Sequence, residues 1–63
     1  MDRAKITISE ADAAKEIGVH VRTLRNWRRA GEGPDFLKIG RIIRYRPVDL
    51  ETWAETKIQT SAA

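Results

Sequence analysis

The feature that most constrains this fold is a turn of only three residues, 18–20, between two short helical patterns. The first pattern predicts a helix over residues 10–17, and the second predicts a helix over residues 21–30. Gly18 suits the left-handed position that follows the last residue of a helix, and Gly31 ends the second helix. Two short helices joined by such a turn form a helix-turn-helix.

The first helix has a clear start and an expected buried stripe. Ser9 and Asp12 resemble a capping box in which Asp replaces the usual Glu. Ala11, Ala14 and Ile17 recur at helical spacing, so these three residues are expected to face the core.

The second helix has two different faces. Leu24 sets its inward direction, and Val21, Trp27 and Arg28 lie within about 60° of it. The outward face has no acidic residue to neutralise it and carries Arg22, Arg25, Asn26 and Arg29. Because solvated helix faces usually mix both signs of charge, this face predicts contact with DNA. Arginine can bind guanine bidentately and asparagine can bind adenine, and the major groove accepts a helix.

A β-hairpin and a third helix are predicted next. The apolar runs 36–39 and 42–46 are separated by Gly40 and Arg41, and glycine at the first position of a two-residue loop suits a type II′ turn. Pro47 suits the first position of a third helix. The fold class is therefore mainly α with a β-hairpin: a winged helix-turn-helix with a two-stranded wing and a C-terminal helix. The expected core residues are Ile17, Leu24, Trp27, Tyr45, Leu50 and Trp53, with Ile58 extending the apolar stripe of the third helix.

The net charge of +3 is concentrated in the middle of the chain. Residues 22–46 hold eight basic and two acidic residues, a net charge of +6, whereas residues 1–21 and 47–63 have net charges of −1 and −2. The positive segment coincides with the second helix and the hairpin, and its flanks supply the two scaffold helices.

The composition excludes several functional classes. There is no cysteine and only one histidine, so we expect no disulfide, no metal site and no cofactor. No apolar run approaches the roughly 18–20 residues of a membrane span, and the N-terminus is not a secretory signal, so the expected location is the cytoplasm. No phosphate-binding glycine loop, nucleophile elbow or metal motif is present, so a non-enzymatic protein is expected.

Three residues at or in the second helix leave alternatives open. Arg28 either lies beside the core with its charged end in water or reaches a phosphate. Thr23 either packs within the motif or bonds a phosphate. His20, at or near the N-cap, is either a turn residue without special chemistry or a contact to a phosphate or base edge.

The hairpin carries four cations, Lys38, Arg41, Arg44 and Arg46. Arg41 lies at the predicted tip, where a wing can enter the minor groove and meet its concentrated negative potential. Arg44 and Arg46 are further candidates for DNA contact. Charges on a hairpin also protect an edge strand from aggregation, and both roles are compatible.

Over about residues 8–53 the sequence resembles the small excisionase/MerR-like winged helix-turn-helix proteins. The matching pieces are residues 9–14, 18–27, 33–34, 39–41, 43–46 and 49–53. The sequence departs from that group at His20 and Val21, where the group usually has a small capping residue and a polar residue. The resemblance implies that the second helix enters the major groove, and that Gly40 and Arg41 contact the neighbouring minor groove or backbone.

Free-standing members of that group include phage excisionases, which bind repeated sites, bend DNA and help an integrase excise a prophage, and AlpA-like transcription regulators. The resemblance therefore predicts double-stranded DNA as a partner, with an integrase and head-to-tail self-association as further candidates. The expected module is residues 6–58 between flexible tails at 1–5 and 59–63, without the long dimerisation helix of full-length MerR regulators. A transcription regulator and a protein-interaction adaptor for a recombinase are the alternatives.

Overall fold

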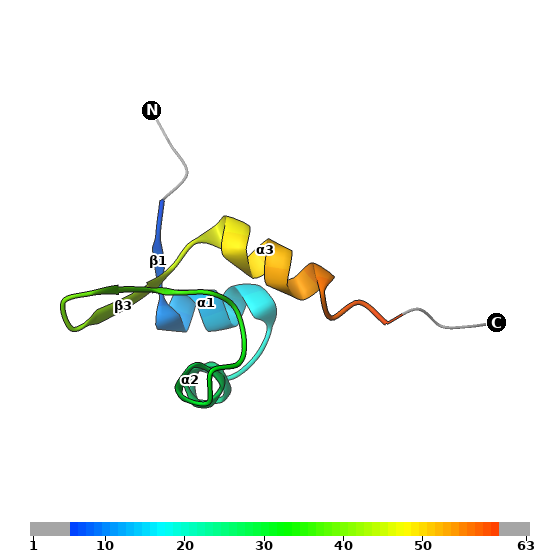
Figure 1. The fold of residues 1–63 in the computed structure, drawn as a ribbon, viewed down its shortest axis with the longest axis horizontal. Coiled ribbons are helices and arrows are strands. Elements are labelled where there is room, and N and C mark those ends of the chain that lie inside the picture. Colours follow the sequence, from blue (N-terminus) through cyan, green and yellow to red (C-terminus); the bar gives the residue numbers. More distant parts are fainter. Residues whose placement is uncertain (1–5, 60–63) are drawn as a thin grey trace.

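The computed structural model describes residues 6–59, and residues 1–5 and 60–63 of the predicted tails lie outside the described part. The elements in chain order are β1 (Ile8–Ser9), α1 (Glu10–Ile17), α2 (Val21–Arg29), β2 (Leu37–Ile39), β3 (Ile42–Tyr45) and α3 (Pro47–Glu55). Figure 1 shows α1 near the centre, α2 and α3 on different sides of it, and the β2–β3 hairpin projecting outward. This is the predicted winged helix-turn-helix. None of the helices within residues 6–59 has the length and apolar character needed to span a bilayer.

Local signals in the sequence account for the helix-turn-helix. The Ser9 hydroxyl caps α1 by accepting a hydrogen bond from the Asp12 backbone N–H at 3.1 Å. Gly18 has a φ of 86° and its N–H donates back into the last turn at 2.8 Å, so α1 ends where the glycine predicted. His20 caps α2, because its Nδ1 accepts a hydrogen bond from the Arg22 backbone N–H at 3.0 Å. α1 has its predicted bounds, and α2 is one residue shorter than predicted.

The hairpin turn is of the kind that the sequence predicts. Ile39 pairs with Ile42 across a two-residue loop, and Gly40 at its first position has a φ of 63°. No residue other than glycine has a positive φ within residues 6–59, so Arg41 has a negative one. This combination fits a type II′ turn and excludes type I′, which needs a positive φ at both positions.

A third strand extends the predicted two-stranded wing. β1 pairs with β3 in antiparallel fashion, and the strand order in the sheet is β1-β3-β2. Ile8 lies opposite Tyr45 and Ser9 lies opposite Arg44. A strand of two residues is too short to show the alternation that marks a strand in a sequence, so only its tertiary pairing reveals it.

The core lies where α1 meets α2, β3 and α3. Its buried residues are Ile8, Ala13, Ala14, Leu24, Tyr45 and Leu50. The half-buried side chains packed against it include Ile17, Val19, Val21, Trp27 and Ile43. The predicted core positions Leu24, Tyr45 and Leu50 are therefore confirmed.

Two predicted core positions are wrong. Ala11 is exposed, because the inward side of α1 follows the spacing of positions 10, 13, 14 and 17 instead. Ala13, which the pattern did not single out, has no exposed surface at all. Ile58 is 72% exposed, because α3 ends at Glu55 and no longer directs that residue toward α1.

Candidate nucleic-acid interface

The outward side of α2 brings together the residues predicted to read bases. Arg22, Asn26 and Arg29 are exposed, and 44% of the Arg25 side chain is exposed. α2 itself contains no acidic residue. A helix with guanidinium and amide groups on one side can place them against base edges in a major groove.

Two further candidates lie at the start of α2. His20 is exposed, but its Nδ1 is occupied by the backbone N–H of Arg22, so only Nε2 is left for a ligand. Thr23 is half-buried, and its backbone N–H donates to the His20 carbonyl at 2.9 Å. The structure therefore gives His20 a capping role and places Thr23 partly inside the motif.

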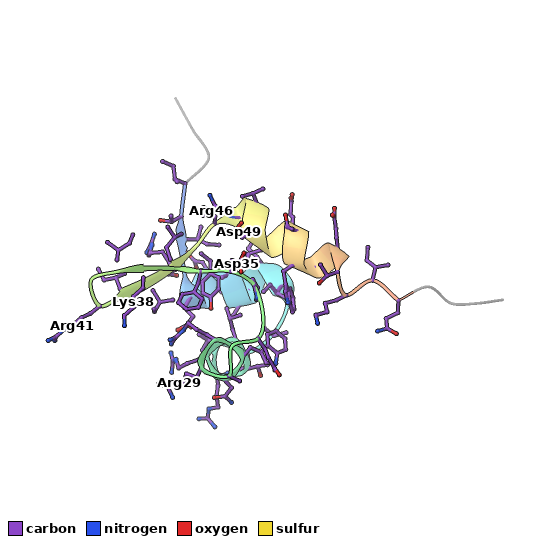
Figure 2. The ribbon with its side chains drawn as sticks, in the orientation of Figure 1. Arg29, Asp35, Lys38, Arg41, Arg46 and Asp49 are labelled. Atoms are coloured by element: carbon purple, nitrogen blue, oxygen red, sulfur yellow. The ribbon has the colours of Figure 1, made fainter. Side chains whose placement is uncertain are left out.

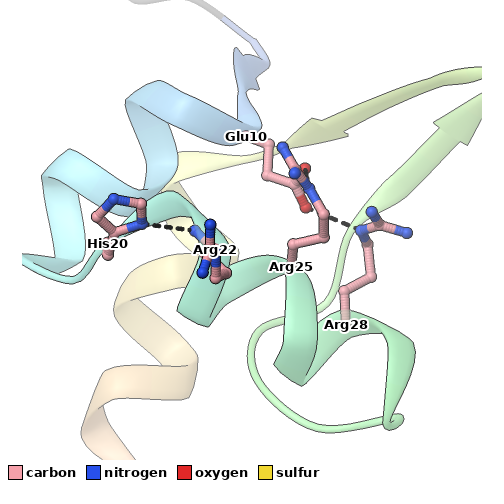
Figure 3. Close-up of polar contacts among 5 residues, drawn as sticks. All are labelled: Glu10, His20, Arg22, Arg25 and Arg28. Carbon is pink, nitrogen blue, oxygen red and sulfur yellow. Dashed lines mark hydrogen bonds and ion pairs between the residues drawn. The ribbon is translucent and has the colours of Figure 1, made fainter.

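One acidic residue lies against the outward face, contrary to the expectation that nothing neutralises it. Glu10, the first residue of α1, has only 13% of its side chain exposed and accepts hydrogen bonds from two arginines of α2. The Nε of Arg28 lies 2.8 Å from Oε2, and the Nε of Arg25 lies 3.4 Å from Oε1. Figure 3 shows both arginine side chains reaching from α2 toward this carboxylate.

Local structure explains why a charged side chain occupies this place. Ser9 pairs with β3 and also caps α1, so the residue that follows it is held over α2. A negative charge in the first turn of a helix is also favoured by the helix dipole. Glu10 therefore joins the sheet and α1 to α2.

Arg28 lies beside the core rather than on the outward face. Only 18% of its side chain is exposed, and its charge is paired with Glu10. Its guanidinium also lies 5.8 Å from the centre of the Phe36 ring. Of the two alternatives open for Arg28, the structure shows the position beside the core, and the phosphate contact stays a prediction.

The buried hydroxyl of Tyr45 lies in the same region. Burial raises the pKa of Tyr45, and the negative charge of Glu10 adds to this rise while Arg28 opposes it. The hydroxyl oxygen has no hydrogen-bond partner among the described residues. Glu10, Arg25, Arg28 and Tyr45 thus form a polar cluster between α1, α2 and β3.

The four hairpin cations have different surroundings. Arg41 and Lys38 are exposed. Arg44 is half-buried: its Nε donates to the Thr7 hydroxyl and its Nη2 to the Thr7 carbonyl, both at 3.2 Å. These bonds attach β3 to the residue that precedes β1, so the structure shows a bracing role for Arg44.

Arg46 is paired with Asp49 at the start of α3. Its Nε and Nη2 donate to the two carboxylate oxygens at 2.6 and 2.9 Å. The hydrogen bonds lower the pKa of Asp49 and raise the pKa of Arg46. In Figure 2 this pair lies apart from Arg29, Lys38 and Arg41, which follow one margin of the molecule from α2 to the hairpin tip.

Sequence reasoning missed two residues of this region. Glu10 carries a signal, because it occupies the first position of the inward spacing shared by Ala13, Ala14 and Ile17. A carboxylate at such a position indicates a buried partner of opposite charge. Thr7 carries no comparable signal, since its role depends on the unpredicted pairing of β1.

The comparisons with known proteins agree with this geometry. Residues 7–57 match a helix-turn-helix domain, a span that includes every helix and strand described above. A search of curated proteins finds no significant match. Because helix-turn-helix domains place their second helix in the major groove, the match supports DNA binding. The match covers most of the sequence, and the chain belongs to the helix-turn-helix domain family.

Proposed function

We propose that this chain is a non-enzymatic protein that binds double-stranded DNA in a sequence-specific manner. In this proposal α2 lies in the major groove, with Arg22, Arg25, Asn26 and Arg29 toward the base edges. The β2–β3 hairpin lies against the neighbouring minor groove or backbone, with Arg41 at its tip. Contacts to phosphates fix the position of the domain, and contacts to bases supply its preference.

One observation carries the proposal: α2 exposes Arg22, Asn26 and Arg29 on one side and has no acidic residue of its own. A helix face that only keeps a protein hydrated normally mixes both charges. The exposed Arg41 adds a second positive point on the same molecule, at the end of a projecting hairpin. Two separate positive surfaces, one on α2 and one at the hairpin tip, suit binding to a duplex, because a duplex offers both grooves and phosphates for contact.

The test of this proposal is selection of bound duplexes from a randomised pool, followed by gel shifts with variants. The wild-type chain should recover a defined sequence. Arg29→Ala should lower affinity for that sequence about tenfold or more, with the thermal unfolding midpoint unchanged. Lys57→Ala removes the same charge beyond the end of α3 and is the control. Unchanged affinity in both Arg29→Ala and Arg25→Ala would contradict the assignment of α2.

We further propose that the protein works as an excisionase-type architectural factor. A single small module buries only about 600–1,000 Å² on DNA, so tight binding favours several copies on adjacent sites. Head-to-tail contacts between those copies would favour bending and would bring an integrase to the complex. The resemblance of residues 8–53 to small excisionase-like proteins supports this role, at the nucleoid of a bacterial cell.

A footprint distinguishes this role from its alternatives. The DNA to be probed is a candidate attachment site, with and without an integrase encoded beside the gene. Protection of repeated sites, together with stimulation of excision by the integrase, supports the excisionase role. Protection confined to a promoter supports a transcription regulator. Binding to a recombinase with no shift of any duplex at physiological salt supports an adaptor.

A further inference from the structure

We infer that Glu10 is a positioning residue for Arg25, and that it thereby determines the base preference of α2 at the position that Arg25 reads. The inference rests on the proposed DNA-binding function and deepens it. The structural basis is that one nearly buried carboxylate holds the Nε side of the Arg25 guanidinium.

The carboxylate of Glu10 is itself well fixed. Its Oε2 accepts a hydrogen bond of 2.8 Å from Arg28, whose side chain is only 18% exposed. Its backbone starts α1 directly after the capping residue Ser9, which is paired with Arg44 in the sheet. Glu10 is thus anchored from α2 on one side and from β1 on the other.

Arg25 is held by one edge and free at the other. A guanidinium has five N–H donors, one on Nε and four on its terminal nitrogens. The Nε–H points to Oε1 of Glu10 at 3.4 Å, and no further hydrogen bond of the Arg25 side chain is found within residues 6–59. The terminal nitrogens are the pair that can meet O6 and N7 of guanine in parallel.

Orientation before binding improves recognition, because a long side chain that is already restricted loses less freedom when it meets its ligand. The other outward arginines lack this restraint: among the described residues, neither Arg22 nor Arg29 forms an ion pair. The structure therefore distinguishes Arg25, which is oriented by a carboxylate, from two arginines of the same helix that are not.

A competing role for the same carboxylate makes a different prediction. If Glu10 only placed a negative charge near the DNA, it would repel phosphates and weaken binding to every duplex equally. If Glu10 only braced the fold, its loss would lower stability without changing the choice between bases. Of the three roles, only the positioning of Arg25 predicts a loss of discrimination confined to one base pair. That loss should also require Arg25 to be present.

The test compares Glu10→Gln with Glu16→Gln, which removes the same charge from an exposed residue of α1. Each is titrated with the duplex selected by the wild type and with duplexes changed at single base pairs. The base pair read by Arg25 is identified as the one at which Arg25→Ala loses discrimination. Glu10→Gln should lower discrimination there about tenfold and leave it intact elsewhere, and Glu16→Gln should not change it. In the Arg25→Ala background, adding Glu10→Gln should cause no further loss of discrimination at that base pair.

Several outcomes overturn the inference. A wild-type chain that selects no sequence overturns the proposed function and the inference together. A discriminating wild type with equal discrimination in Glu10→Gln overturns the inference alone. An equal rise in the affinity of Glu10→Gln for all duplexes also overturns it. So does a loss of discrimination that is as large when Glu10→Gln is added to Arg25→Ala as when it is added to the wild type.

A measurement on the wild type keeps the inference testable if Glu10→Gln fails to fold. In the free protein, NMR should show the Nε proton of Arg25 exchanging with water more slowly than the Nε proton of Arg22, because only the former is held by a carboxylate. Equal exchange rates for the two protons would overturn the inference.

Discussion

The ring of Trp27 in α2 packs against the ring of Trp53 in α3, with the two centres 5.4 Å apart and the planes tilted by 43°. Tilted aromatic pairs at this spacing contribute about 0.5–1.5 kcal/mol beyond their buried area. The contact joins the helix proposed to read DNA to the last helix of the domain. Both tryptophans therefore occupy packing positions, and both are half-buried.

Replacing Trp53 should test this link. Trp53→Ala should lower the free energy of unfolding by about 2 kcal/mol, which is below the usual cost of removing a fully buried tryptophan because the ring is partly exposed. Trp53→Phe keeps an aromatic ring and should cost less. Urea unfolding followed by circular dichroism measures both, and equal stability of the alanine variant and the wild type would show that the pair contributes nothing.

Gly33 should be more sensitive to substitution than Gly31, although both have left-handed backbones, with φ of 84° and 77°. A Cβ at Gly33 would lie 3.1 Å from the Cβ of Trp27, whereas a Cβ at Gly31 would meet nothing within 4 Å. Gly31→Ala should cost about 1–2 kcal/mol for the backbone alone. Gly33→Ala should cost about 1 kcal/mol more, because Trp27 must also shift. The midpoints of urea unfolding compare the two, and equal losses would contradict the close approach.

Elements that depend on nearby residues were predictable from the sequence. The start of α1 at Ser9, its end at Gly18 and the hairpin turn at Gly40 each follow from a hydrogen bond or a φ angle that one residue type supplies. The outward face of α2 follows from helical geometry around the buried Leu24. These parts of the fold and of the candidate site need no knowledge of tertiary contacts.

Features that depend on residues distant in the sequence were not predictable. The pairing of Ile8 with Tyr45 spans most of the domain, and two residues carry too little pattern to indicate a strand. The same pairing positions Glu10 against Arg25 and Arg28, so the acidic neighbour of the outward face of α2 was missed with it. Arg44 likewise gains its Thr7 partner only once β1 lies beside β3.

The ion pair formed by Arg46 and Asp49 should make the folding stability of the protein depend on pH in the acid range. The hydrogen bonds from Arg46 lower the pKa of Asp49 below its ordinary value of 3.8. A carboxyl group whose pKa is lower in the folded state stabilises the protein above its unfolded pKa, and this contribution is lost as pH falls through the folded value. The stability of the wild type should therefore fall more steeply below about pH 4 than that of Asp49→Asn.

Arg46→Gln is the matched variant for this pH test, because it removes the other half of the pair and with it the hydrogen bonds that lower the pKa of Asp49. Unfolding free energies measured between about pH 6 and pH 2 should show the same flattened dependence in both variants. A slope in Asp49→Asn equal to that of the wild type would show that the pair does not form in solution.

Arg41 should contribute to DNA binding mainly through its charge. It is exposed at the hairpin tip, beside Gly40, and no ion pair within residues 6–59 involves it. A cation that meets a phosphate or the minor groove displaces counterions, so its loss weakens binding to all duplexes and reduces the dependence on salt. Arg41→Ala should therefore lower affinity for selected and unrelated duplexes by a similar factor. Its plot of log affinity against log salt should be shallower by about one unit.

Arg41→Lys is the control that separates charge from shape. It keeps the positive charge at the tip of the hairpin, so its salt slope should match that of the wild type even if a preference for a narrow minor groove is lost. Titrations between about 50 and 200 mM salt measure the slopes. If Arg41→Ala has the same slope as the wild type, the hairpin tip does not touch the duplex.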